Sequence, residues 1–532
     1  MNLSSRVSTL SLGPPGCLCA HEDWDDATHA APKQGLHGQD RGFCYPEWLK
    51  AQVVLLHKKG DRGQCKNWRA ISLLDVASKV LSRIIVRRLH KSMGRVSTED
   101  QNGFRQERGC ADATFSVLQA LRKRKEHGQS SWCCWVDLIR AFDSVPREVL
   151  WACASRLGVG PVLLDALKRL HEGANIEVDV DGTKARCASR LGVRQGSVEG
   201  PLLCLCVFQC CLESCIFPAS MTPPLFRTSG DAKVAGEQHD REQGLNFEYN
   251  QSLYADDAAL IFTSRQDMEV GLRTLIAHMR TCGLYAHVGT AGQKSKTECQ
   301  YFPAKGEAQE DGNTSPIDLG DGELLHFCTE FKYLGTTIPS DLTTEPEIST
   351  RMRKAQGAFA VMRSVLTDRD LPLKTRGNYY KVLVLTVLLF GSESWAMCKV
   401  HFDQLTAFHR RCVRAMAHTS LWKTRIHRIT TTSLLESAGI RPLIQYFDKR
   451  LLQWAGKLAR MPLTRMPRRM MTAWVPSRRP RGIAKTWGQT LNDCLKRNDV
   501  PTRVSEWVGI ACDQDGGNAS EAVLWLMGTK VH

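Results

Sequence analysis

The stretch Tyr254-Ala255-Asp256-Asp257 lies between two apolar, strand-like runs, Gln251–Leu253 and Ala258–Phe262. Two short strands joined by so few polar residues predict a β-hairpin with neighbouring carboxylates at its tip. Asp is common in tight turns, so the pair alone has little weight. Adjacent carboxylates can, however, hold divalent cations against a phosphate chain.

A third acid upstream completes the pattern. Asp137 follows the apolar run Trp132–Val136, which predicts a buried strand that ends at this acid. One acid at a strand end and two on a hairpin form the arrangement that two-metal nucleotidyl transfer requires. The sequence therefore indicates Asp137, Asp256 and Asp257 as one candidate metal site.

The overall composition limits the class of protein. The chain has 532 residues, enough for about three domains, and 42% of them are hydrophobic, which supplies sizeable cores. Lys and Arg number 71 against 55 Asp and Glu, so the net charge is +16. Such an excess favours a polyanionic partner, either nucleic acid or an anionic membrane. The longest apolar run, Val382–Phe390, is far shorter than the roughly 20 residues that cross a bilayer, so we expect no membrane span.

The cysteines predict a reducing compartment. There are 21 of them, scattered along the chain and often inside apolar stretches such as Cys204–Cys211, where Cys acts as a small hydrophobe. No Cys-x-x-Cys pair occurs, and the odd count argues against a secreted disulfide scaffold. We therefore expect no disulfide partner. Residues Met1–Ala20 lack the continuous apolar core of a secretion signal, so we expect an intracellular, nuclear location.

A basic amphipathic helix is predicted near the start of the chain. Between Val76 and Leu89 apolar residues recur with a helical period, while Lys79, Arg83 and Arg87 line another side. The apolar positions are Val76, Val80, Leu81, Ile84, Ile85 and Leu89. The basic side is either a solvated face or a contact to a nucleic-acid backbone.

Other local patterns predict a mixed chain that becomes helical towards its end. The predicted elements are strands at 52–57 and 176–180, a helix at 268–282, a strand turn at 331–335, an apolar helical stripe (Ile348, Met352, Ala355, Phe359 and Met362) and a buried segment at 379–390.

The C-terminal part is the most basic. Between Lys449 and Arg497 there are thirteen Lys or Arg residues and one acid, Asp493. We predict that Arg478, Arg479 and Arg481, beside a helix-breaking proline, bind nucleic acid. Three tryptophans interleave with these charges, namely Trp454, Trp474 and Trp487. They either stack on bases or pack a small helical core.

Several blocks, in order, resemble the reverse transcriptases of non-LTR (LINE-type) retrotransposons, from about Trp48 to about Lys496. The blocks are 53–61, 67–73, 101–105, 108–112, 136–143, 192–201, 254–257, 283–297, 331–335, 389–393 and 454–457. The resemblance implies an α+β right-hand polymerase with fingers, a palm built on an antiparallel sheet, a helical thumb and a basic C-terminal helical region. We expect a flexible leader at 1–45, fingers and palm at 46–340 with a loop insertion at about 214–248, a thumb at 341–425 and the basic region at 426–532.

The resemblance also implies roles for particular residues. Asp137, Asp256 and Asp257 would be the catalytic metal ligands. The dNTP would be bound by Lys58 and Arg69 at its triphosphate, by Phe142 under the sugar, and by Gln195 and Gly196 at the nascent base pair. Lys296 would contact nucleic acid. Two features depart from the family pattern, since Ala70 stands where proline is usual and an insertion between Val288 and Ser295 separates the two halves of the block that contains Lys296.

The implied function is RNA-directed DNA synthesis. Two Mg²⁺ ions, with Mn²⁺ as an alternative, would serve the transfer of nucleotides to a primer 3′-hydroxyl. The partners would be an RNA template, a DNA primer or target and dNTPs, with no membrane. No endonuclease domain is expected before Trp48. Two alternatives stay open: a decayed, non-catalytic nucleic-acid-binding remnant, and a polymerase of the intron-maturase or viral-replicase type.

Overall fold

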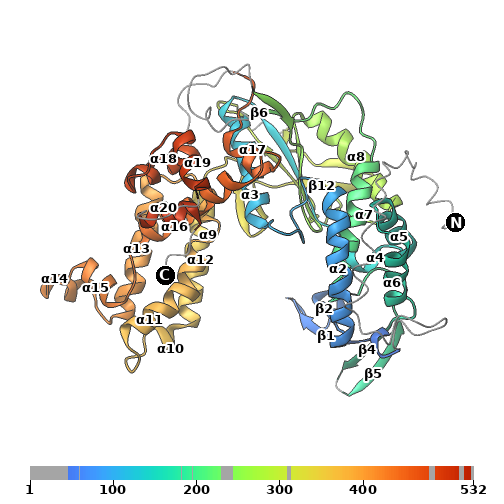
Figure 1. The fold of residues 1–532 in the computed structure, drawn as a ribbon, viewed down its shortest axis with the longest axis horizontal. Helices are drawn as coiled ribbons and strands as arrows, with labels where there is room; N and C mark the ends of the chain where they lie inside the picture. Colours follow the sequence, from blue (N-terminus) through green and yellow to red (C-terminus); the bar gives the residue numbers. More distant parts are fainter. Residues whose placement is uncertain are drawn as a thin grey trace.

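The computed structural model describes residues 46–58, 60–96, 98–180, 182–194, 196–228, 244–307, 313–477, 486–513 and 520–528. The leader predicted at 1–45 lies outside the described residues, as do Gln195, Arg478, Arg479 and Arg481. Figure 1 shows two arms that extend from a central sheet, one built by the first half of the chain and one by its helical second half. Mixed sheets and helices confirm the predicted α+β class.

The fingers arm contains a four-stranded sheet in the order β2-β1-β4-β5. Its strands are β1 (Lys50–His57), β2 (Trp68–Leu73), β4 (Asn175–Val180) and β5 (Thr183–Ala188). The β1–β2 and β4–β5 pairs are antiparallel hairpins, whereas β1 and β4 run parallel. Helices α2 (Val76–Val96), α5 (Arg147–Arg156) and α6 (Pro161–His171) belong to the same arm (Figure 1).

Helix α2 buries a different face from the one that its apolar period predicts. Val76 and Val80 are 74% and 57% exposed, whereas Ser78 and Ser82 are almost fully buried. Ile85 and Leu89 are buried as expected. The prediction was wrong for the first two turns, where two small hydroxyl side chains are buried in place of the valines.

The palm is a six-stranded sheet in the order β11-β12-β10-β3-β9-β8. Its strands are β3 (Ser131–Val136), β8 (Gln251–Tyr254), β9 (Asp257–Phe262), β10 (Glu298–Phe302), β11 (Ile317–Gly320) and β12 (Glu323–Phe327). The central strand β3 is buried on both faces, which explains its unbroken apolar sequence. Cys133 and Trp135 pack into one core with α3 (Cys110–Glu126), and alternate residues pack into another with α7 (Gly200–Ser214) and α8 (Arg265–Thr281).

The insertion predicted as a loop at about 214–248 carries two strands, so that prediction was wrong in part. Strands β6 (Leu225–Thr228) and β7 (Leu245–Glu248) pair antiparallel, and Phe226 stacks on Phe247 at 5.7 Å. The backbone of Arg227 also exchanges hydrogen bonds of 2.8 Å with that of Trp474, which ties the ribbon to the C-terminal region.

The thumb follows the palm as a set of packed helices. They are α9 (Glu345–Val361), α10 (Arg363–Leu366), α11 (Leu373–Tyr380), η6 (Lys381–Leu385), α12 (Thr386–Leu388), η7 (Ser392–Ser394), α13 (Lys399–Met416), α14 (Leu421–Ile426) and α15 (Thr431–Ser437). The stripe predicted on α9 is confirmed, since Ile348 and Ala355 are fully buried and Met352, Phe359 and Met362 pack against the core.

The C-terminal region is a helical group arranged around one central helix. It contains α16 (Leu443–Arg460), α17 (Met466–Thr472), α18 (Trp487–Arg497), α19 (Val504–Cys512) and α20 (Glu521–Met527). Helix α16 packs against the other four. Among the described helices, none combines the length and hydropathy needed to span a bilayer.

Several cations of this region are used inside the protein. Lys457 and Arg465 bind the carboxylate of Asp112 at 2.9 and 3.0 Å, and Arg497 binds Asp448 at 2.6 Å. These pairs lie within the fold, so part of the local positive charge that predicts a nucleic-acid surface serves to join the C-terminal region to the palm and to itself.

Of the two alternatives for the tryptophans, the structure shows packing in the helical core for Trp454 and Trp487. Trp454 and Trp487 are buried and meet the Phe115 ring of α3 edge to face, at 5.4 and 4.9 Å. The indole nitrogen of Trp487 donates to the carbonyl of Glu393 at 2.7 Å. The half-buried Trp474 pairs with strand β6. Buried in this way, Trp454 and Trp487 offer no ring face to a base.

Asp112 is expected to be a major contributor to stability. Its fully buried carboxylate accepts hydrogen bonds from Lys457, Arg465 and the backbone nitrogen of Gly109. Because removing one partner leaves buried charge uncompensated, Asp112→Asn should lower the free energy of unfolding by about 3 kcal/mol. Urea denaturation of the full chain, followed by circular dichroism, measures this change.

The matched control is Asp165→Asn, which breaks an exposed ion pair with Arg169, four residues later on α6. Exposed pairs contribute at most about 1 kcal/mol. Equal losses of stability in the two variants would contradict the structural role assigned to Asp112.

Candidate active site

The pairing of β3 with β9 brings the predicted acids together. Val136 and Ala258 are register partners in this antiparallel ladder, so the next positions at the same end are Asp137 and Asp257. Directly opposed residues in such a ladder have Cβ atoms about 5 Å apart. Asp256 occupies the adjoining turn between β8 and β9.

Electrostatic effects are consistent with this closeness. Desolvation, then the charges of Asp256 and Asp137, raise the pKa of Asp257 to about 6. Burial also raises the pKa of Asp256, and the negative charge of Asp137 adds to this shift. The three carboxylates therefore repel one another, and a cation between them would relieve that repulsion.

The turn that carries Asp256 is held by residues whose role sequence reasoning missed. Ala255 has a φ of +60°, a conformation that costs an L-residue about 1 kcal/mol. The side-chain oxygen of the buried Gln101 accepts hydrogen bonds from the backbone nitrogens of Ala255, at 3.1 Å, and Gly103, at 2.8 Å. This oxygen therefore fixes the strained turn to a separate segment.

Gly103 makes the closest approach to this turn. A Cβ atom at this position would lie 2.3 Å from the backbone nitrogen of Ala255, so only glycine fits. The neighbouring backbone is paired as well, since the Asn102 nitrogen donates to the Leu253 carbonyl at 2.8 Å. The glycine in the sequence Gln101-Asn102-Gly103 was the available signal, but its partner lies about 150 residues away.

Thr297 and Lys296 complete the surroundings of Asp137. The Asp137 nitrogen donates to the Thr297 hydroxyl oxygen at 3.1 Å, and this hydroxyl donates to the Asp137 carbonyl at 3.2 Å. The His287 nitrogen donates to the same carbonyl at 2.8 Å. Lys296 is exposed and places its Nζ 3.7 Å from a carboxylate oxygen of Asp137.

The inserted stretch between Val288 and Ser295 does not separate Lys296 from the site. Gly289 pairs through its backbone with Leu324 of β12 at 2.9 Å in both directions. Thr290 and Gln293 then close a tight turn that reverses the chain. The insertion is thus anchored on the palm sheet and returns the chain to the end of β3.

The two finger cations lie on the β1–β2 hairpin. Lys58 follows β1, and its nitrogen donates to the Asn67 carbonyl at 2.8 Å, while Arg69 stands opposite Leu56 on β2. Both side chains are exposed. The charge of Arg69 partly opposes the upward shift in the pKa of Asp256, and that of Lys58 acts in the same way on Asp143. Both cations therefore act electrostatically on acids of the palm.

Phe142 and Gly196 lie where the fingers meet the palm. Phe142 is half-buried and lines a small pocket together with Ala255 and Asp256. Gly196 has a φ of +113°, and a Cβ atom there would lie 2.4 Å from the Ser72 carbonyl oxygen of β2. Phe142 thus lies beside the turn that carries Asp256, whereas Gly196 lies against the fingers strand β2.

A further hairpin packs against the palm sheet, where a strand turn was predicted at 331–335. Strands β13 (Glu330–Tyr333) and β14 (Thr336–Pro339) pair antiparallel across a turn at Leu334 and Gly335, both with positive φ. The Phe331 ring stacks on Trp135 of β3 at 4.9 Å, almost parallel to it. The hairpin is therefore fixed to the strand that delivers Asp137.

Comparison with known proteins identifies the family. Residues 56–338 match the family described as "Reverse transcriptase (RNA-dependent DNA polymerase)". This chain belongs to that reverse transcriptase family. The predicted family is thereby confirmed, and divalent metal ions are general to reverse transcriptases.

Similar proteins come from mobile elements. The reverse transcriptase is 26% identical to the "Probable RNA-directed DNA polymerase from transposon BS" of Drosophila melanogaster, over 84% of this chain and 46% of that protein. It is 24% identical to the "RNA-directed DNA polymerase from mobile element jockey" of Drosophila funebris, over 77% of this chain and 42% of that protein. The chain thus spans less than half the length of these relatives. An apo telomerase from Candida tropicalis aligns with a TM-score of 0.37 at 10% identity, over 81% of this chain and 70% of that chain, a weak likeness.

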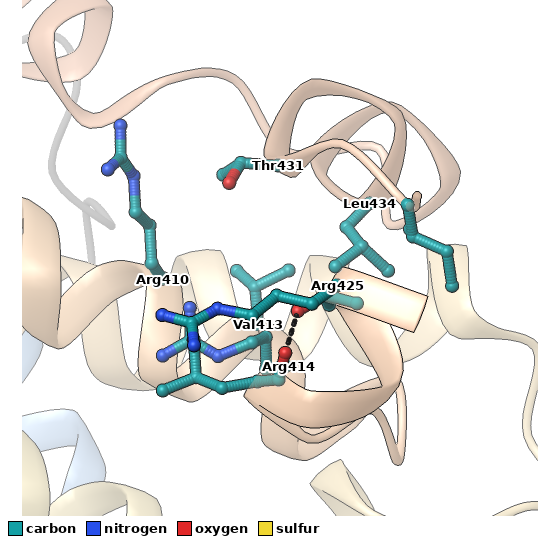
Figure 2. A pocket seen from close by; sticks show the side chains of 9 residues that line it. Arg410, Val413, Arg414, Arg425, Thr431 and Leu434 are labelled. Carbon is teal, nitrogen blue, oxygen red and sulfur yellow. Dashed lines mark hydrogen bonds between the residues drawn. The ribbon is translucent and has the colours of Figure 1, made fainter. Parts of the chain in front are cut away.

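The thumb of this reverse transcriptase carries a cationic hollow that sequence reasoning also missed. It lies among α13, α14 and α15 and is lined by Arg410, Val413, Arg414, Leu421, Thr424, Arg425, Ile429, Thr431 and Leu434 (Figure 2). Among the described residues, no carboxylate forms an ion pair with its three arginines. Unpaired guanidinium groups suit phosphate oxygens, in contrast to the internally paired Arg465 and Arg497 of the C-terminal region.

Proposed function

We propose that this chain is an RNA-directed DNA polymerase that extends a primer 3′-hydroxyl with dNTPs on an RNA template. The observation that carries the proposal is the placement of Asp137, Asp256 and Asp257 at one end of the β3–β9 ladder, with Lys58 and Arg69 acting on the palm acids from the fingers. This set combines ligands for a divalent cation with cations for a triphosphate.

The metal site would use the three carboxylates of the palm. Carboxylate oxygens are ligands that Mg²⁺ prefers. Burial, with a further contribution from the neighbouring carboxylates, raises the pKa values of Asp256 and Asp257, which fits a site completed by cations. We propose two Mg²⁺ ions, with Mn²⁺ able to replace them at the same oxygen donors. When bound, they supply charge stabilisation to the attacking and leaving oxygens.

The remaining side chains bind and orient the substrates. Lys58 and Arg69 bind the triphosphate, the Lys as a point charge and the Arg through forked hydrogen bonds. Phe142 excludes a 2′-hydroxyl by its bulk and so selects deoxynucleotides, while Gln195 and Gly196 contact the nascent base pair. The primer hydroxyl forms the new P–O bond at the α-phosphate, and pyrophosphate leaves.

Nucleic acid would be held by cations outside this centre. We assign this role to Lys296 beside Asp137, to Arg478, Arg479 and Arg481 in the C-terminal region, and to the three thumb arginines. We also propose that the chain acts inside the cell, in the nucleus, where a DNA target would be available.

Primer extension tests the proposed function. The purified chain, an RNA template annealed to a DNA primer and the four dNTPs should give extended products when Mg²⁺ is present. A chelator should abolish the products, and added Mn²⁺ should restore them. Absence of extension with either ion, while a reference reverse transcriptase extends the same substrate, would favour the decayed remnant instead.

A further inference from the structure

Helices α7 and α8 lie next to each other (Figure 1), and α8 also packs on strands β3 and β9 of the palm sheet. A group of thiols and one imidazole lies at the ends of these two helices. Cys211 is in the last turn of α7, and Cys215 follows it four residues later at the end of the helix. His278 and Cys282 have the same spacing at the end of α8. Residues four apart share one face of a helix, so each helix presents a pair of donors.

Three of these donors converge. One ligand atom each from Cys211, His278 and Cys282 lie within 4.8 Å of one another. A tetrahedral zinc site with Zn–S near 2.3 Å and Zn–N near 2.0 Å needs donor separations of about 3.5–3.8 Å. Contraction of about an ångström would therefore close the site. Cys211 and Cys282 are both buried.

The imidazole of His278 is already oriented. Its Nε2 lies 2.9 Å from the Ser214 hydroxyl oxygen, and that hydroxyl donates to the Cys210 carbonyl at 2.7 Å. The Ser214 hydroxyl therefore holds the imidazole ring in place between the ends of the two helices. Fixing of a histidine ligand through its other nitrogen is usual in zinc sites.

Of the described residues, only Cys211, His278 and Cys282 form a cluster of three converging donors. A second thiol pair, Cys134 with Cys299, also hydrogen-bonds in the core but lacks a histidine.

We propose that Cys211, His278 and Cys282 bind one zinc ion that joins the ends of α7 and α8. Two soft thiolates and an imidazole select zinc, whereas the carboxylates at the end of β3 select Mg²⁺. The two metal sites are therefore chemically distinct, and the zinc site does not depend on the proposed polymerase function.

The zinc ion would support the frame of the active centre. The first turns of α7 contribute Pro201 and Cys204 to the pocket that Phe142 and Asp256 also line. Helix α8 begins three residues after β9, which carries Asp257. A link between the far ends of these two helices would hold in place the edge of the sheet that contains the β8–β9 hairpin.

Metal analysis of the full chain tests the proposal. Protein purified without chelators should contain about one zinc per chain, and Co²⁺ in its place should produce thiolate-to-metal charge-transfer absorption. Cys282→Ser and His278→Ala should each weaken metal affinity at least tenfold. The control Cys134→Ser changes an equally buried thiol of the other pair and should leave zinc content unchanged.

Three results would overturn the proposal. The first is a chain without zinc that gives no charge-transfer bands with Co²⁺. The second is a disulfide between Cys211 and Cys282 in freshly purified protein, detected by mass spectrometry. The third is equal zinc loss in Cys134→Ser. If Cys282→Ser does not fold, the Co²⁺ titration of the unaltered chain still shows whether thiolates bind the metal.

Discussion

Replacing Asp256 with Asn is expected to reduce RNA-templated primer extension at least about 10³-fold while leaving nucleic-acid binding intact. The amide keeps the size of the side chain but removes one of the three negative charges that would hold the cations. Several kcal/mol of transition-state stabilisation would be lost with it, and each 1.4 kcal/mol changes the rate about tenfold. Single-turnover incorporation of one dNTP measures the chemical step directly.

The control for this substitution is Asp165→Asn on α6, which removes the same charge from an exposed ion pair in another part of the fold. Its extension rate should match that of the unaltered chain. Fluorescence anisotropy with a labelled primer–template should give similar affinities for all three proteins. A rate for Asp256→Asn within tenfold of the unaltered chain would remove Asp256 from the catalytic site.

The second large effect is expected from Gly103→Ala, with a loss of about 10²-fold in kcat. The added Cβ would meet the backbone of Ala255 at 2.3 Å, and two backbone segments cannot yield as a flexible side chain does. The turn carrying Asp256 must therefore shift, and a displacement of about 1 Å at reacting groups can cost 10²-fold. Steady-state extension measures kcat and the KM for dNTP separately.

A positioning role for Gly103 predicts a fall in kcat with an unchanged KM for dNTP, because Lys58 and Arg69 are untouched. Gly357→Ala is the control, since nothing lies within 4 Å of its added Cβ on α9 and alanine favours a helix. It should keep full activity. A thermal unfolding midpoint that falls as steeply as kcat would instead make Gly103 a residue of general stability.

Local signals in the sequence were sufficient for the centre of the fold. The apolar run before Asp137 predicted β3. The short stretch Tyr254–Asp257 between two apolar runs predicted the β8–β9 hairpin. Both predictions succeeded because strand period and turn length are set by neighbouring residues. The three acids were indicated by their places at a strand end and in a hairpin, whereas the dNTP-binding residues came from resemblance. The register pair Val136–Ala258 shows why two segments more than a hundred residues apart could share one site.

The missed features depend on contacts that no local pattern contains. Gln101 acts on Ala255, and Asp112 binds Lys457 and Arg465, across 154, 345 and 353 positions. Charge counting alone could not tell such internal cations from those of the thumb hollow. The exposure of Val76 was missed for the same reason. A helical period identifies an apolar face but does not show whether another part of the chain covers it.

Iron-directed cleavage tests the shared metal site most directly. Fe²⁺ in place of Mg²⁺, with ascorbate and peroxide, produces hydroxyl radicals that cut the backbone beside the bound ion, and mass spectrometry locates the cuts. We predict two clusters of cuts that appear together, one around Asp137 and one around Asp256. Excess Mg²⁺ should suppress both clusters. Cuts at only one of these segments, or at neither, would contradict a common cation site.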